Sequence, residues 1–135
     1  MSKLLRRANW MLKLFGITKI PLIFFCRPKI LNLDDKSIEL RIPLNRRTKN
    51  HLGSFYFGAF SIGADITAGF FAMHLINKSK DNVQLIFKDF KADFLKRAEG
   101  DVHFYCNMGT QISDLVSKAI SSHDRVNFPV LIIAK

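Results

Sequence analysis

Apolar and polar residues follow two different periods along this chain, and the two periods predict helices and strands in turn. Residues 2–15 carry apolar side chains at helical spacing and basic side chains between them, which predicts a basic amphipathic helix within residues 1–16. Gly16 and Pro21 are typical of the end of such a helix. We expect its apolar face to dock on its own domain, and contact with a membrane surface through residues 1–15 is the alternative.

Other segments have the alternation or the composition of β-strands: residues 22–33, 37–44, 83–95, 101–108 and 127–135. Pro28 interrupts the first of them, so an edge strand or a bent strand is expected there. The last is apolar on both faces, as a strand in the interior of a sheet would be.

Residues 53–77 form an apolar run with a single formal charge, Asp65, and are long enough to be taken for a membrane span. A lone carboxylate in the middle of a bilayer is costly, and amphipathic strands flank the run on both sides. We therefore interpret the run as a long central helix with Ser54 as its candidate cap, and residues 109–122 as a shorter second helix.

The order of these elements predicts the fold class. A helix, two strands, a long helix, two strands, a short helix and a strand indicate an α+β protein, in which a curved antiparallel sheet wraps around the long central helix. With 135 residues, the chain is long enough for one hydrophobic core, so residues 1–135 are interpreted as a single domain.

Composition adds three points. The 13 phenylalanines suit a large core or a pocket for an apolar ligand, and the net charge of +10 favours anionic partners such as lipid headgroups, nucleic acid or a phosphate-bearing cofactor. Cys26 and Cys106 are expected to be buried thiols rather than a disulfide. Lys13 interrupts any signal-peptide core and no cleavage site follows, so a cytoplasmic location is predicted.

The search for chemistry leads to the central helix. Motifs of nucleophile elbows, phosphate-binding loops, dinucleotide folds and metal sites are missing from the sequence, so no metal and no cofactor are expected. On a helical wheel, small or medium side chains surround Asp65: Gly58, Ser61, Ile62, Ala68, Gly69, Ala72 and Ile76. The opposite side carries bulky ones: Tyr56, Phe60, Phe70, Phe71 and His74.

Asp65 is therefore the candidate general base, standing in open space beside the small side chains. As a buried carboxylate without partners it would have a raised pKa, whereas a purely structural Asp would be hydrogen-bonded. Free N–H groups of Phe57 and Gly58 at the start of the helix could polarise a carbonyl. Gly58 and Asp65 lie about 10 Å apart along the axis, so a cooperating pair would come from two copies of the chain, which predicts a dimer.

The segments NHLGSFYFGAFSIGADITAG and KDFKADFLKRAEGDVHF resemble hot-dog-fold proteins, in a branch beside the phenylacetyl-CoA-type acyl-CoA thioesterases. Tyr56-Phe57-Gly58 stands where that family has a His-Gly-Gly turn, and Ala64-Asp65 matches its Ala-Asp pair. Replacement of His-Gly by Tyr-Phe alters the turn that polarises the carbonyl. The family also continues into one more strand, so the chain is interpreted as lacking the last strand of the fold.

The resemblance implies hydrolysis of an acyl-CoA thioester, with Phe57 and Gly58 polarising the carbonyl and Asp65 acting as general base or nucleophile. It also implies a set of substrate-binding residues near the turn and the helix: Asn50, His51, Ser54, Tyr56, Ser61 and Ile62. Basic residues are candidates for the CoA phosphates, the alternative being a solvated strand end: Lys88, Lys91, Lys96 and Arg97.

Three functions remain open at this point. The first is a thioesterase acting on acyl-CoA or an acyl-carrier thioester, as a homodimer or a dimer of dimers. The second is a hot-dog protein that binds an acyl chain or an acyl carrier without hydrolysis. The third is a basic protein that contacts a membrane surface or nucleic acid, although the chain lacks a recognisable nucleic-acid module and no nucleic acid is expected.

Overall fold

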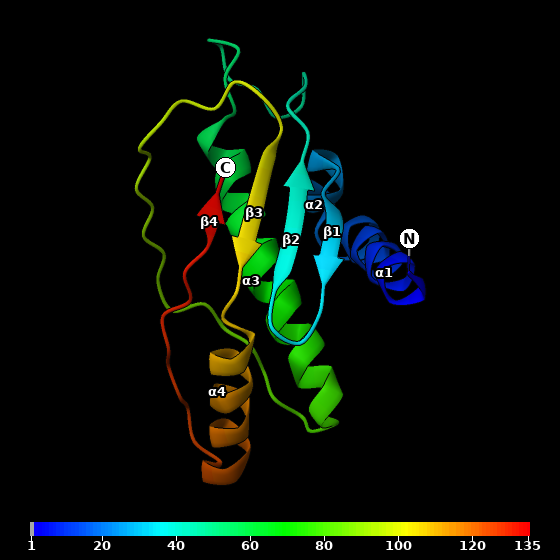
Figure 1. Ribbon diagram of the computed structural model, residues 1–135, viewed down its shortest axis with the longest axis vertical. Helices are drawn as coiled ribbons and strands as arrows, with labels where there is room; N and C mark the ends of the chain where they lie inside the picture. The colour runs from blue at the N-terminus through cyan, green and yellow to red at the C-terminus, as the bar shows by residue number, and fades with distance from the viewer. Residues whose placement is uncertain (1) are drawn as a thin grey trace.

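The computed structural model describes residues 2–135, in which four strands form one antiparallel sheet in the order β1-β2-β3-β4. A long helix, α3, lies against one face of this sheet (Figure 1). In chain order the elements are α1 (Lys3–Thr18), α2 (Pro21–Cys26), β1 (Lys29–Leu33), β2 (Ile38–Ile42), α3 (Phe57–Ser79), β3 (Val102–Cys106), α4 (Gly109–Ser122) and β4 (Ile133–Ala134). The α+β class, the antiparallel sheet and the long helix are as the sequence predicts.

The two central strands show why the alternating pattern was informative. Every second side chain of β2 and β3 is buried, because successive side chains of a strand point to opposite faces. The buried side chains stand opposite one another in the register of the sheet: Ile38 and Cys106, Leu40 and Phe104, Ile42 and Val102. These pairs form the floor on which α3 packs.

The helix α3 approaches the sheet closely at Gly63. A Cβ atom at this position would lie 2.1 Å from the Phe104 ring, a distance that no real contact allows, so the hydrogen of glycine is needed there. One turn later, the buried hydroxyl of Thr67 donates to the Gly63 carbonyl at 2.6 Å. The helix is long and apolar enough to cross a membrane, but half of its apolar stretch is buried inside the domain, as expected for a core helix.

The helix α1 docks on its own domain, as the amphipathic pattern predicts. Its buried face consists of Ala8, Leu12 and Gly16. The side-chain amide of Asn9 donates to the Ile30 carbonyl at 2.9 Å and accepts from the Ile30 N–H at 2.8 Å. Because these are backbone groups of β1, Asn9 covers the outer edge of the first strand.

Residues 22–26 are helical, so the strand predicted from residue 22 is wrong in its first half. Pro21 occupies the first turn of α2, where its fixed φ suits a helix and its missing N–H costs nothing. Phe24 packs beside Gly16, and this contact with α1 outweighs the β propensity of the segment. The strand β1 begins just after Pro28, at Lys29.

Two other predicted strands differ in the structure. Residues 83–95 are extended but pair with no described strand, and most of their side chains are exposed. Of residues 127–135, only β4 and the adjacent Lys135 pair with β3, and these three residues are exposed at the border of the sheet rather than buried in its interior. A strand needs a neighbour for its backbone hydrogen bonds, and in Figure 1 the segment after α3 runs apart from β4 with no strand between them.

Candidate functional site

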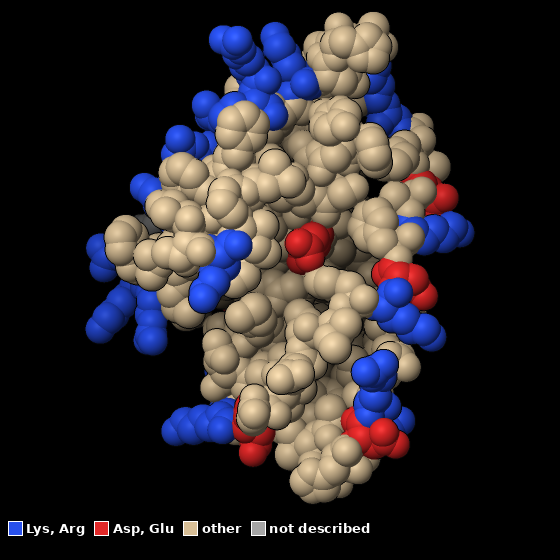
Figure 2. All heavy atoms as spheres, turned by 180° about the vertical axis from the view of Figure 1, so that it is seen from behind, with Lys and Arg blue, Asp and Glu red and all other residues tan. Residues whose placement is uncertain are grey.

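Asp65 lies on the side of α3 that faces away from the sheet, and its side chain is exposed. The expectation of a buried carboxylate is therefore wrong, because the small residues beside it leave it open to solvent. Within residues 2–135, no group donates a hydrogen bond to the carboxylate and no basic side chain pairs with it. Figure 2 shows this face, with a small acidic patch in the middle of uncharged surface and basic side chains towards the rim.

Apolar neighbours nevertheless withdraw the Asp65 carboxylate from water enough to raise its pKa, the direction predicted from the sequence. One of these apolar neighbours lies beside Gly69, which is one turn further along α3. A Cβ atom there would lie 3.6 Å from the Phe87 ring and 3.9 Å from the Asp65 carboxylate. The extended segment after α3 therefore places an aromatic ring close to the carboxylate.

The raised pKa of Asp65 predicts a pH-dependent difference between the protein and its Asp65→Asn variant. The folded state holds the carboxyl proton more tightly than the unfolded chain, so ionisation costs stability from about pH 4, the ordinary Asp value, up through the raised pKa. We expect the variant to gain stability relative to the parent as the pH rises through this window. Urea midpoints across the window measure it, and a pH-independent difference contradicts the raised pKa.

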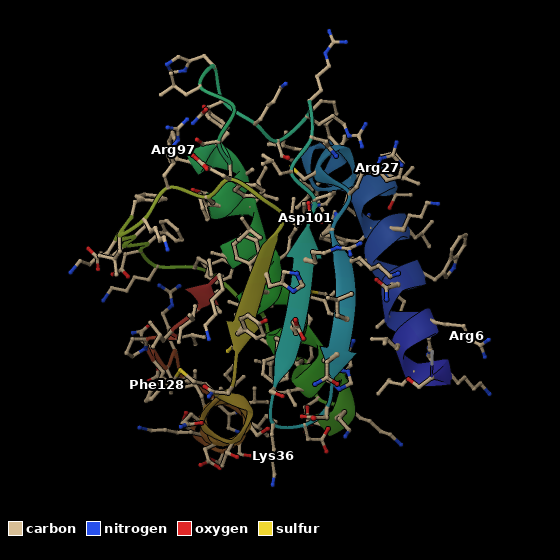
Figure 3. All side chains as sticks on the ribbon, turned by 45° about the horizontal axis from the view of Figure 1, so that its top comes forward. Arg6, Arg27, Lys36, Arg97, Asp101 and Phe128 are labelled. Atoms are coloured by element: carbon tan, nitrogen blue, oxygen red, sulfur yellow. The ribbon has the colours of Figure 1, made fainter. Side chains whose placement is uncertain are left out.

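A groove of about 360 Å³ lies at the start of α3. Its lining comes from the loop before the helix, the first turns of the helix and the end of the extended segment: Asn50, Leu52, Ser54, Phe55, Phe57, Phe60, Phe94, Leu95, Lys96, Arg97 and Ala98. Arg97 donates to the Ser54 hydroxyl and, at 2.8 Å, to the Leu52 carbonyl. In Figure 3, Arg97 lies beside the first turn of α3.

The groove has an aromatic wall and a basic rim. Phe94 contacts two rings of α3, with centroids 6.3 Å from Phe57 and 5.6 Å from Phe60. Phe55 packs on Phe60 at 4.7 Å. Lys96 stands beside these rings, so an apolar chain could lie along the wall while an anionic group met the rim.

The first turn of α3 keeps free backbone donors. Tyr56 is the N-cap and makes no side-chain capping bond, and no described residue accepts from the N–H groups of Phe57 or Gly58. The Tyr56 ring lies directly over Gly58, since a Cβ atom there would be 2.4 Å from it. These donors could polarise a carbonyl at the groove, and Tyr56 decides how closely it approaches.

The structure brings together part of the predicted site. Residues that line the groove are Asn50, Ser54, Phe57, Lys96 and Arg97. Ser54 does not cap α3, because the helix begins three residues later and its hydroxyl accepts from Arg97 instead.

The other predicted residues lie outside the groove. Asp65 is about 10 Å further along the helix, as its spacing from Gly58 requires. The Ser61 hydroxyl donates to the Phe57 carbonyl at 3.2 Å, and Ile62 is half-buried on the same helix. His51 is exposed in the turn before α3, and Lys88 and Lys91 are exposed on the extended segment.

Sequence reasoning missed three apolar residues that line the groove. Phe55, Phe94 and Leu95 carry no motif, and Phe94 reaches the helix only through tertiary packing. The excess of phenylalanine was the available signal. Throughout the described part of the chain, no cluster of His, Cys, Asp or Glu could hold a metal ion. Cys26 and Cys106 are buried free thiols, as expected from the sequence.

The fold and this groove define a class of α+β proteins in which a long helix lies on an antiparallel sheet. The chain belongs to the family described as a domain of unknown function, DUF4442, whose model matches residues 8–134. No curated protein matches the chain.

Solved structures with the same fold share little sequence with this chain. A protein of unknown function from Chlorobaculum tepidum TLS superposes with a TM-score of 0.75 at 13% identity, covering 87% of this chain and 72% of the other. A protein of unknown function from Pseudomonas aeruginosa, described as a probable thioesterase, gives a TM-score of 0.69 at 21% identity, covering 84% of this chain and 75% of the other. At these identities the likeness shows the fold.

Proposed function

We propose that this protein is a hot-dog-fold thioesterase that hydrolyses an acyl-CoA or a related acyl thioester, in a branch beside the phenylacetyl-CoA-type enzymes. The observation that carries the proposal is the start of α3, where free N–H groups of Phe57 and Gly58 border an aromatic groove with a basic rim. The structural neighbour described as a probable thioesterase supports the same reaction class.

In this proposal the groove binds both the acyl chain and the CoA moiety of the substrate. The acyl chain lies along the rings of Phe57, Phe60 and Phe94, and Lys96 meets a phosphate of the CoA moiety. Arg97 is already bonded to Ser54 and Leu52, so it shapes the groove wall and adds positive potential. The N–H groups at the start of α3 polarise the thioester carbonyl.

Asp65 supplies the base. The ionised carboxylate takes a proton from water as the water oxygen bonds to the carbonyl carbon. The C–S bond then breaks, and the departing thiolate receives the proton from Asp65, which restores the carboxylate. A raised pKa makes the ionised Asp65 carboxylate a stronger base than an ordinary Asp.

The two halves of this site come from two copies of the chain. One carbonyl cannot meet both the first turn of α3 and a carboxylate about 10 Å further along the same helix. Asp65 is exposed on the face of α3 that points away from the sheet, so a second copy of the chain can reach it. A homodimer, or a dimer of dimers, thus places Asp65 of one copy beside the groove of the other.

Incubation of the purified protein with acyl-CoAs of increasing chain length tests the proposed reaction. We expect release of free thiol from at least one of them, measured with a thiol reagent. Binding in calorimetry without thiol release would favour the second candidate, an acyl-binding protein without hydrolysis. One observation speaks for that candidate: the Tyr56 ring covers Gly58, one of the two proposed donors.

A further inference from the structure

The helices α1 and α2 expose an unusual number of large apolar side chains for a surface that faces solvent. Trp10 is 62% exposed, and four further apolar side chains of α1 and α2 have exposed fractions between 47% and 58%. We name these residues the α1–α2 face: Trp10, Leu14, Ile17, Leu22 and Phe25. Trp10, Leu14 and Ile17 follow helical spacing, so they form one stripe on the side of α1 opposite its buried residues.

The same two helices carry a large share of the positive charge. Residues 2–33 contain seven Lys or Arg and no Asp or Glu, since the first acidic residue of the chain is Asp34. Arg6 and Lys13 lie along one edge of the apolar stripe on α1 and Arg7 lies along the other, and Arg6 extends away from the helix in Figure 3. Figure 2 shows basic side chains along the side of the molecule where α1 lies.

We propose that the α1–α2 face docks this protein on the surface of a bilayer that contains anionic phospholipids. Exposed Trp and aliphatic side chains between basic residues are what an interfacial helix inserts below the headgroups while its charges meet the lipid phosphates. The long stems of Arg6 and Lys13 let their charged ends stay at the headgroup level as the stripe enters.

The charge and the apolar stripe together favour an anionic lipid surface over two other partners, a second copy of the chain and nucleic acid. A second copy of the chain would bring an equally basic, acid-free surface against the first, and like charges oppose such an interface. Nucleic acid would satisfy the charge but would leave the apolar stripe without a partner. An anionic lipid surface satisfies both properties.

Trp10 is the chain's single tryptophan, so its fluorescence reports on this face directly. The full-length protein is titrated with vesicles of phosphatidylcholine that contain about 30% phosphatidylglycerol, and with vesicles of phosphatidylcholine alone. We expect a shift of Trp10 emission to shorter wavelength, together with co-sedimentation, for the anionic vesicles. Absence of the shift at low salt, or an equal shift with both kinds of vesicle, overturns the proposal.

Two matched double variants separate this face from net charge. Arg6→Gln with Lys13→Gln removes two charges beside the stripe, and Lys36→Gln with Lys118→Gln removes two from the β1–β2 turn and α4. We expect about 30-fold weaker partitioning for the first pair, a factor of about five for each charge. The second pair should change it by less than about threefold. Equal losses of partitioning for the two pairs would show that binding depends only on the net charge of the protein, which overturns the proposal.

A third variant tests the apolar stripe. Leu14→Gln with Ile17→Gln keeps every charge and changes side chains that are about half exposed, so the fold is expected to persist, which circular dichroism checks. Loss of the Trp10 shift supports insertion of the stripe. Unchanged binding and an unchanged shift would show that the stripe does not enter the bilayer, which contradicts the proposed docking.

Discussion

Replacement of Asp65 with asparagine is expected to lower kcat for thioester hydrolysis by about 10²–10⁴-fold. Asparagine has nearly the same shape but cannot take a proton from water. The side chain is exposed and makes no hydrogen bond with any of residues 2–135, so the variant should fold like the parent protein. Steady-state rates of thiol release with the best acyl-CoA measure the loss, and KM should change little because the proposed role of Asp65 is to activate water rather than to hold the substrate.

Asp114→Asn is the matched control, since Asp114 is also an exposed carboxylate on a helix but lies on α4. Its rate should equal that of the parent protein. Turnover that survives in Asp65→Asn would contradict the role of Asp65, even if the protein proves to be a thioesterase.

Mixing of two inactive variants tests whether the site is shared between copies. Asp65→Asn lacks the base, and Gly58→Val fills the first turn of α3, where a Cβ atom already meets the Tyr56 ring. In a random mixture, half of the dimers contain one of each, and each of these has one intact composite site. About a quarter of the parental activity should therefore return. If no activity returns after subunit exchange, Asp65 and the first turn of α3 act within one copy, which contradicts the shared site.

The second large effect concerns stability: Phe104→Ala is expected to lower the free energy of unfolding by about 3–5 kcal/mol. The Phe104 ring is 1% exposed, sits against Gly63 and has the Phe55 and Phe60 rings 6.4 Å and 6.3 Å away. Alanine would leave a cavity between helix and sheet. Because small proteins are stable by only about 5–15 kcal/mol, urea unfolding should show a large shift in midpoint.

Phe128→Ala removes the same atoms from a ring that is 46% exposed, and should cost much less. A loss for Phe104→Ala no larger than for Phe128→Ala would contradict the described packing of α3 on the sheet. Gly63→Ala should itself destabilise the protein by about 1–3 kcal/mol, and this cost should fall when combined with Phe104→Ala, since the clash is with that ring.

Much of the fold could be predicted because the deciding pattern is local. Ile38, Leu40 and Ile42 alternate along β2, and the apolar residues of α1 and α4 recur at helical spacing, so each element shows its buried face in its own sequence. The outward position of Asp65 follows from the same helical geometry. The exposure of the Asp65 side chain does not follow from helical geometry, since it depends on how much of the chain covers the helix.

The errors lie where a distant partner decides the conformation. Residues 83–95 alternate like a strand, but alternation cannot say whether a neighbouring strand is present to pair with them. Phe24 has a strong β propensity, yet a contact with Gly16 holds it in a helix. The groove was missed in part for the same reason: Phe94 and Phe57 are 37 positions apart and meet only in the folded chain.

The bonds between Asn9 and Ile30 have a consequence for how the sheet can grow. They occupy the outward backbone groups of Ile30 in β1 with a side chain, so within residues 2–135 a further strand can pair without interruption only at the other border, beyond Ile133 and Ala134. Two copies that paired through this border would leave neither copy with a free border for a further strand. Growth of the sheet would then stop at two chains, which gives a finite particle instead of a fibre.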